Sequence, residues 1–300
     1  MMEMNSVASN KNKNKHKRYL ETSAEVLFFI LTLASILAVA LICGFIFVNG
    51  IPAIYKIGVK EFLFGTEWMP TATPPRFGIF PMILGSIYVT AGAIVIGVPI
   101  GVLTAIYMAG FSSKRYYKTL KTALNLMAGI PSIVYGFFAL MVIVPFFKKL
   151  FGGSGFSMLT AMVVLVIMIL PTIIGLSEAA IRAVPKSYYE GALAMGVTHE
   201  YAMGLVVVPA AKSGILSAVI LGVGRAIGET MAVVMIAGNQ PNIPTSLFKG
   251  ARTMTSNIIM EMAYAAGLHR EALLGTGAIL FIFILIINIL FNAVNRRALK

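Results

Sequence analysis

Six long apolar runs limit what this chain can fold into. They cover residues 26–48, 79–108, 124–147, 157–174, 214–237 and 273–292. An α-helix rises about 1.5 Å per residue, so about 20 residues cross the ~30 Å hydrocarbon layer of a bilayer. Only 12% of the 300 residues are charged, about half the share found in an average soluble domain. The runs therefore predict an all-α, polytopic membrane protein with about six transmembrane helices.

Lys and Arg are distributed unevenly between the segments that join these runs. Segments on the same side as the N-terminus carry 15 of them, the opposite segments carry 8, and only Arg225 lies inside a run. Because positive residues accumulate on the cytoplasmic side, we expect both termini in the cytoplasm. The net charge of +13 then reflects topology and contact with membrane lipid, and nucleic acid is not expected as a partner. The expected parts are a basic cytoplasmic N-terminal tail (1–25), a first transmembrane helix (26–48), an external segment (49–78), a main membrane region (79–295) and a cytoplasmic C-terminal tail (296–300).

One inner segment, residues 184–209, is too polar to span a membrane and too rich in helix formers to be a flexible linker. We call it the polar loop. Pro185 suits the first turn of a helix, and Gly196 stands where a left-handed C-terminal cap is expected. Thr198 can cap a second helix, which Pro209 would separate from the next span. The polar loop is thus predicted to form two short helices around a glycine corner. These signals leave open whether it docks against a partner or only joins two spans.

The polar loop carries a motif with defined spacing. Glu190-Gly191-Ala192 is followed by three residues, Gly196, nine residues and then Val206, Val208 and Pro209. This pattern resembles the EAA loop of ABC-importer permeases, which reads E-A-A, three residues, G, nine residues, I-x-L-P. In that family the loop sits in a groove of the ATP-hydrolysing subunit. The resemblance implies a MetI-like permease fold for the main membrane region, and a coupling role for Glu190, Gly191, Ala192, Gly196 and Pro209.

Two further motifs narrow the resemblance. Residues 129–136 (GIPSIVYG) and 224–232 (GRAIGETMA) look like the permeases of phosphate-specific ABC importers, and Trp68-Met69-Pro70 followed by Phe77-Gly78 is similar to their C-type subunit. This implies half of a heterodimeric pathway that moves inorganic phosphate into the cytoplasm. It also implies the cell membrane of a prokaryote and the following partners: a sister permease, two cytoplasmic ATPase subunits that hold ATP and Mg, and an external phosphate-binding protein.

Arg225 and Glu229 are the charged residues of the 224–232 motif. Four residues apart on one helix, they would share a face and could pair. An ionisable residue within a span normally faces a polar path or a partner. We hypothesise that Arg225 attracts phosphate in transit, that Glu229 keeps it from binding too tightly, and that neutral donors come from Ser132, Tyr135 and Thr230. The alternative is a buried structural ion pair beside hydroxyl groups that only pack helices.

No catalytic or metal site is expected in this chain. A G-x-x-x-x-G-K-[ST] phosphate loop does not occur, so ATP is expected on a partner subunit. One cysteine, three histidines and no aspartate leave few groups for catalysis or for metal binding. Two other functions stay open. A permease for another oxyanion would keep the ATPase partner, whereas a secondary transporter driven by an ion gradient would need none.

Overall fold

The computed structural model describes residues 2–298, and the chain divides into two compact units, Met1–Asn49 and Gly50–Lys300. The first unit is helical, as the N-terminal part of α1 (Met2–Ile57). This helix ends where Gly58 adopts a φ of 100°. The residues predicted as a tail, a first span and the beginning of an external segment therefore belong to one helix.

The second unit is mainly helical, with two short strands in its described part. β1 and β2 pair antiparallel, with Trp68 opposite Phe77. After α1 the elements are α2 (Val59–Phe64), β1 (Trp68–Met69), β2 (Arg76–Phe77), α3 (Phe80–Ile106), the π-helical η1 (Tyr107–Phe111), α4 (Lys114–Gly129), α5 (Ser132–Phe138), the π-helical η2 (Ala139–Ile143), α6 (Val144–Phe151), α7 (Met158–Arg182), α8 (Lys186–Ala194), α9 (His199–Ala202), the π-helical η3 (Met203–Val207), α10 (Val208–Ala210), α11 (Lys212–Gly228), α12 (Met231–Ile236), α13 (Met254–Glu261) and α14 (Gly267–Ala298).

The prediction of an all-α protein with about six membrane spans is confirmed. Across residues 2–298, five helical stretches are long and apolar enough to cross a membrane: Glu21–Ile57, Phe80–Phe111, Ser132–Phe151, Met158–Arg182 and Gly267–Leu290. A sixth candidate is a bent pair, His199–Ala210 with Lys212–Gly228, whose two parts meet at 67°.

Apart from the first span, which lies within the longer α1, three predicted spans have clearly different bounds in the structure. The span expected at 124–147 begins at Ser132, because α4 continues to Gly129 and stops before Pro131. The span expected at 214–237 is not one helix, since α11 ends at Gly228 and α12 begins two residues later. The span expected at 157–174 continues to Arg182, so two further charged residues lie in a span helix.

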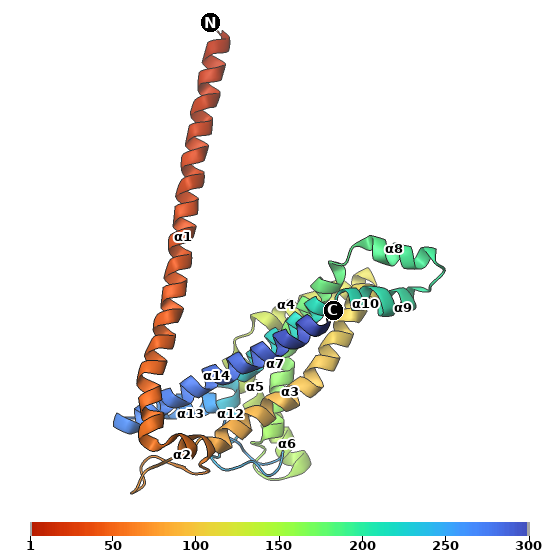
Figure 1. Cartoon of the computed structure of the whole chain (residues 1–300). Helices are drawn as coiled ribbons and strands as arrows, with labels where there is room; N and C mark the ends of the chain where they lie inside the picture. The colour runs from red at the N-terminus through yellow and green to blue at the C-terminus, as the bar shows by residue number, and fades with distance from the viewer. Residues whose placement is uncertain (1, 299–300) are drawn as a thin grey trace. The chain divides into compact units, whose positions relative to one another are not determined.

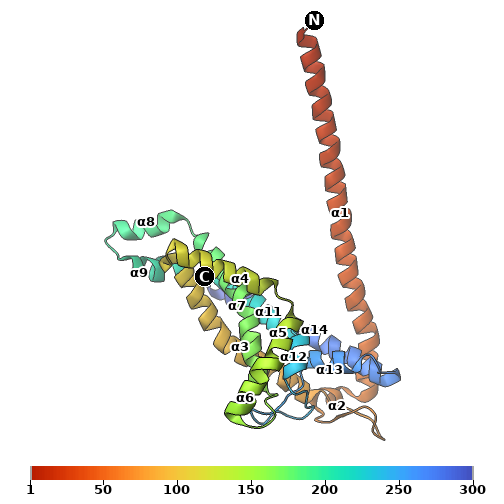
Figure 2. The same ribbon diagram turned by 180° about the vertical axis from the view of Figure 1, so that it is seen from behind.

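α7 lies at the centre of the second unit, where α3 and α11 pack against it (Figures 1 and 2). Glycines allow this close approach. A Cβ added at Gly97 of α3 would lie 2.8 Å from an atom of Ile169, and one at Gly222 of α11 would lie 2.7 Å from an atom of Ile173. Both figures place α8 and α9 at one end of this bundle and α2 and α6 at the other end. The polar loop is therefore remote from the segment that carries the strand pair.

A polar cluster holds the strand pair against α13 and α14. Trp68 Nε1 donates a hydrogen bond of 2.8 Å to the buried carboxylate of Glu261. The same carboxylate lies 2.7 Å from Arg252 Nη1 and 2.8 Å from His269 Nε2. Trp68 of the sequence motif thus has a structural role at this end of the molecule.

Candidate functional site

The polar loop has the predicted glycine corner. α8 begins at Lys186. Pro185 is therefore its N-cap residue, directly before the helix, and not part of the first turn as expected. Gly196 comes two residues after the last residue of α8 and has a φ of 80°, a backbone conformation that glycine adopts without the steric cost of a Cβ. α9 then begins after Thr198, which holds the predicted N-cap position, although its side chain makes no capping hydrogen bond. Pro209 does not separate this helix from the next span, because it lies inside α10, and the 67° bend falls at Ala211.

α8 is an exposed helix without a single buried residue. Of the motif residues, Glu190, Gly191, Gly196 and Pro209 are exposed and Ala192 is half-buried. A Cβ added at Gly191 or Gly196 would meet nothing within 4 Å. Large apolar side chains of the polar loop are also exposed, and these are Tyr188, Leu193, Met195, Tyr201 and Leu205. Clustered apolar side chains of this kind mark a surface on which another protein can dock.

His199 connects the two helices of the polar loop to the end of α3. Its Nδ1 lies 2.9 Å from the Tyr189 hydroxyl of α8, and its Nε2 lies 3.0 Å from the Gly110 carbonyl of η1. The carbonyl can only accept, so Nε2 carries the proton and Nδ1 accepts from Tyr189. The Phe111 ring meets the imidazole edge-on, with 4.9 Å between ring centroids. The position of α8 therefore depends on the end of α3.

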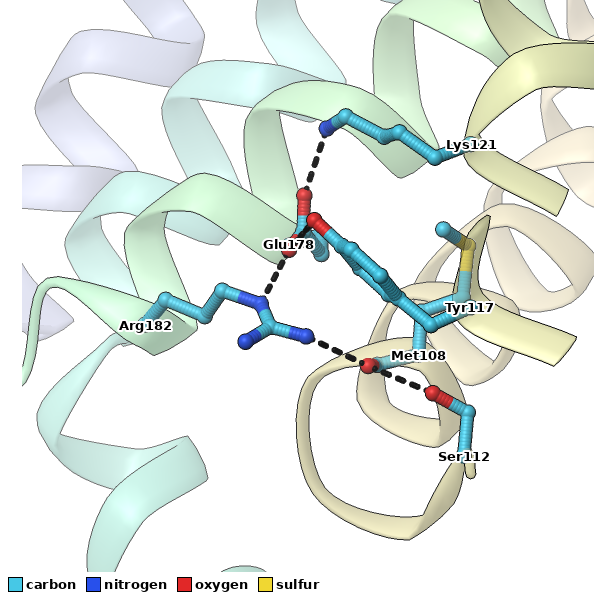
Figure 3. A network of polar contacts seen from close by, with 6 residues as sticks. All are labelled: Met108, Ser112, Tyr117, Lys121, Glu178 and Arg182. Carbon is cyan, nitrogen blue, oxygen red and sulfur yellow. Dashed lines mark hydrogen bonds and ion pairs between the residues drawn. The ribbon is translucent and has the colours of Figure 1, made fainter. Parts of the chain in front are cut away.

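Glu178, one turn before the end of α7, is the centre of a buried polar network (Figure 3). Its side chain is 2% exposed and is paired with Lys121 of α4 at 2.7 Å and with Arg182 of α7. The Tyr117 hydroxyl donates to the same carboxylate at 3.1 Å. Arg182 also donates to the Met108 carbonyl of η1 at 3.0 Å, and its guanidinium lies over the Tyr117 ring. One carboxylate thus joins α4, α7 and, through Arg182, η1.

Sequence reasoning missed this network. The sequence did contain a signal for an ion pair, because Glu178 and Arg182 stand four residues apart. Glu178 is also one of only 11 acidic residues in the chain. The span was predicted to end at Ile174, so both residues were placed outside the spans, where a surface ion pair carries little information.

Arg225 is exposed on α11 within the bent candidate span. Its Nη1 donates to the Thr172 hydroxyl of α7 at 3.3 Å. Within residues 2–298 no carboxylate forms an ion pair with Arg225. Gly224 and Gly228 leave open space beside it, since a Cβ at either would meet nothing within 4 Å. This is a guanidinium with unused donors on an open face.

The predicted pairing of Arg225 with Glu229 is wrong. The two residues are not on one helix, because α11 ends at Gly228 and Glu229 has an extended backbone with ψ of 128°. Glu229 Oε1 instead accepts a hydrogen bond of 3.1 Å from the Ala232 N–H, which caps the start of α12. The alternative of a buried structural ion pair is wrong for the same reason.

Two of the three predicted neutral donors are already engaged. Tyr135 donates to the Met127 carbonyl at 2.8 Å, and Thr230 donates to the Gly228 carbonyl at 3.2 Å. Among the described residues the Ser132 side chain has no hydrogen-bond partner. Its helix, α5, packs on α12, where Gly136 is in close contact with Ala232. α5 therefore lies next to the break between α11 and α12. The part of the chain described here holds no group of three or more His, Cys, Asp or Glu that could bind a metal ion.

Known proteins with similar sequences are membrane subunits of transporters. The chain is 38% identical over 272 residues to the "Probable ABC transporter permease protein YqgH" of Bacillus subtilis, covering 87% of this chain and 86% of that protein. It is 34% identical over 278 residues to the phosphate transport system permease protein PstC of Mesorhizobium japonicum, covering 85% of this chain and 84% of that protein. With PstC of Haemophilus influenzae it shares 33% identity over 250 residues, covering 77% and 79%.

Solved structures show the same fold. A bacterial alginate ABC transporter, solved with its pentasaccharide-bound periplasmic protein, matches with a TM-score of 0.66 and 16% identity over 91% of this chain and 95% of that chain. The MetNI methionine ABC transporter in an inward-facing conformation matches with a TM-score of 0.55 and 21% identity. The match covers 74% of this chain and 94% of that chain. The chain thus has the MetI-like permease fold. Residues 97–300 match the family model for the "Binding-protein-dependent transport system inner membrane component". The chain is therefore a multi-pass membrane permease that belongs to this family.

Proposed function

We propose that this chain is one half of the membrane pathway of an ATP-driven phosphate importer, in the position of the C-type permease subunit. The names of its PstC relatives support phosphate as the substrate. The observation that carries the proposal is Arg225, an exposed guanidinium in the bent candidate span without a carboxylate partner among the described residues. A charge in that place is costly unless it has a function or a partner.

Arg225 is suited to an oxyanion. A guanidinium presents several N–H donors in a planar fork that matches the oxygens of phosphate. Its bond to Thr172, at 3.3 Å, is a long one and leaves most of these donors free. Ser132 is the second candidate contact, because its hydroxyl has no partner in the described residues. Phosphate would then be held by few bonds, which suits a pathway from which it must also leave.

The exposed polar loop supports a cytoplasmic ATPase as the source of energy. We propose that the importer has two ATPase subunits, which hold ATP and Mg, and that the polar loop docks on one of them through its motif residues Glu190, Gly191, Ala192, Gly196 and Pro209. α8 would present its exposed apolar side chains to that subunit. In this assignment the polar loop and both termini lie in the cytoplasm of a prokaryotic cell, as the Lys and Arg distribution predicts. A sister permease forms the other half of the pathway, and an external phosphate-binding protein delivers the anion.

Reconstitution of the complex in lipid vesicles tests the proposal. The permease pair, the ATPase and the binding protein are combined, and uptake of labelled phosphate is measured together with ATP hydrolysis. Phosphate is expected to stimulate both, and replacing Arg225 with Gln is expected to lower uptake by about tenfold to a hundredfold while the complex still assembles. Phosphate uptake that is normal in the Arg225→Gln complex would refute the assignment of the pathway.

The same vesicles separate the two other functions. If sulfate, molybdate or a phosphonate stimulates ATP hydrolysis and phosphate does not, the chain serves another oxyanion. If this chain alone takes up phosphate without ATP and in response to an ion gradient, it is a secondary transporter.

A further inference from the structure

We infer that η1, the π-helical end of α3, is the joint through which movement of the polar loop reaches the spans, and that Glu178 and His199 are its positioning residues. The inference rests on the proposed function and adds a route for the mechanical step. Two attachments made by separate residues support it.

The first attachment connects the end of α7 to η1. Arg182 is the last residue of α7 and donates to the Met108 carbonyl of η1 at 3.0 Å. Its orientation is set on the other side by the Glu178 carboxylate, which accepts from Arg182 Nε. Three residues after Arg182 comes Pro185, the N-cap of α8. Displacement of α8 therefore pulls directly on a residue that is bonded to η1.

The second attachment connects the other side of the polar loop to the same segment. His199, the first residue of α9, bonds to the Gly110 carbonyl of η1 and to the Tyr189 hydroxyl of α8. Packing reinforces it, because Met203 fills the space next to Gly110, so that a Cβ there would lie 2.5 Å from the Met203 methyl carbon. η1 is thus held from the end of α7, just before the polar loop, and from the second helical part of the polar loop.

The position of η1 explains why these bonds form at this place. The last carbonyl groups of a helix lack partners within the helix. η1 ends at Phe111, so the Met108 and Gly110 carbonyls belong to this terminal set. Arg182 and the Ser112 hydroxyl both donate to the Met108 carbonyl, and His199 donates to the Gly110 carbonyl. A bond that satisfies a helix end also fixes that end to whatever carries the donor.

Glu178 extends the joint to α4. Lys121 and Tyr117 of α4 bond to the same carboxylate that orients Arg182. The inner ends of α3, α4 and α7 therefore move together with α8 when α8 is displaced. Without the carboxylate, Arg182 loses its orientation and α4 loses its attachment to α7, while α8 keeps the exposed surface that meets the ATPase.

The test compares ATP hydrolysed with phosphate transported in the same reconstituted vesicles. Glu178→Gln and Lys121→Met are expected to raise the number of ATP hydrolysed per phosphate by about fivefold or more, the range of a typical coupling between sites. His199→Phe is expected to raise the same ratio, because it removes the bonds of the second attachment. Lys118→Met is the matched control, because Lys118 is an exposed lysine one turn earlier on α4 and none of the described residues pairs with its side chain. Its ratio should equal that of the wild type.

A double variant makes the test specific. Glu178→Gln combined with Lys121→Met should raise the ratio no further than Glu178→Gln alone, because both remove the same bond. An unchanged ratio in Glu178→Gln vesicles, with uptake and hydrolysis falling together in proportion to the amount of assembled complex, would refute the joint and leave Glu178 a purely structural residue. A wild-type complex that transports no phosphate would refute the proposed function instead.

Discussion

Glu178 and Arg225 are both charged residues within candidate spans, and their surroundings are opposite. Glu178 is 2% exposed and accepts hydrogen bonds from three side chains on two helices. Arg225 is exposed, and among the described residues its side chain makes one hydrogen bond, of 3.3 Å, to a hydroxyl. The carboxylate is saturated by the protein, whereas most donors of the guanidinium are unused.

The difference separates charge that holds helices together from charge that can meet a ligand. A buried charge that is fully hydrogen-bonded stabilises one arrangement of the elements that carry its partners. An exposed charge with free donors leaves the protein almost unchanged when it is removed, and its loss is felt by whatever binds there. Removing Glu178 should therefore affect stability, and removing Arg225 should affect transport.

Replacing Glu178 with Ala should produce the largest loss of stability. We expect a loss of about 3 kcal/mol in the free energy of unfolding, at the low end for a broken buried pair because Lys121 and Arg182 can reach water. Thermal unfolding of the purified complex measures this. Glu190→Ala is the control, since Glu190 is exposed and should change stability by less than about 0.5 kcal/mol. Equal losses of stability in Glu178→Ala and Glu190→Ala would show that the Glu178 network does not hold the helices together.

Replacing Arg225 with Gln should lower phosphate uptake by about tenfold to a hundredfold, the value of a hydrogen bond to a charged group. Stability should stay within about 0.5 kcal/mol, because within residues 2–298 the bond to Thr172 is the one hydrogen bond that is lost. Phosphate uptake with Arg225→Lys should lie between that of the wild type and that of Arg225→Gln, since lysine keeps the charge but lacks the planar fork of donors. Uptake in vesicles and thermal unfolding are measured on the same preparations. A large loss of stability with uptake intact would show that Arg225, like Glu178, holds helices together and does not meet a ligand.

Two glycines of the polar loop should respond oppositely to the same change. A Cβ meets nothing within 4 Å at either Gly196 or Gly191, so only the backbone decides. Gly196→Ala should destabilise α8 by about 1 kcal/mol, because φ is 80° there. Gly191→Ala should stabilise the same helix by about 1 kcal/mol. Hydrogen exchange of the α8 amides measures both, and faster exchange in both variants would contradict the backbone explanation.

Replacing Glu229 with Gln should have the smallest effect. The amide oxygen can still accept from the Ala232 N–H, so the cap of α12 should lose about 0.5 kcal/mol or less. Phosphate uptake should stay within about threefold of the wild type if capping is the role of this residue. A change in the KM for phosphate with stability intact would instead place the Glu229 charge in the pathway.

The polar loop was the part of the fold that could best be predicted from the sequence. Its glycine corner follows from local rules, because the conformation of Gly196 and the start of α9 after Thr198 depend on residues close in the chain. The number of spans follows from the length of the apolar runs. Both are properties that a single stretch of sequence carries by itself.

The chemistry around Arg225 and Glu178 could not be predicted in this way. Residues 231–237 are apolar and continue the preceding run, so hydropathy did not reveal that the backbone breaks at Glu229. Lys121 is distant in sequence from Glu178, and their contact depends on how α4 packs against α7. Whether a hydroxyl such as that of Tyr135 is free to meet a ligand depends on a carbonyl that only the folded chain places beside it.

The exposed apolar surface of α8 and α9 has a consequence for the life of the protein in the cell. Tyr188, Leu193, Met195, Tyr201 and Leu205 lie open on the described chain. Before assembly, such a surface invites aggregation and recognition by chaperones or proteases. We expect copies of this subunit that are made in excess of their docking partner to be degraded. The same surface that receives force in the complex would then also keep the numbers of the subunits matched.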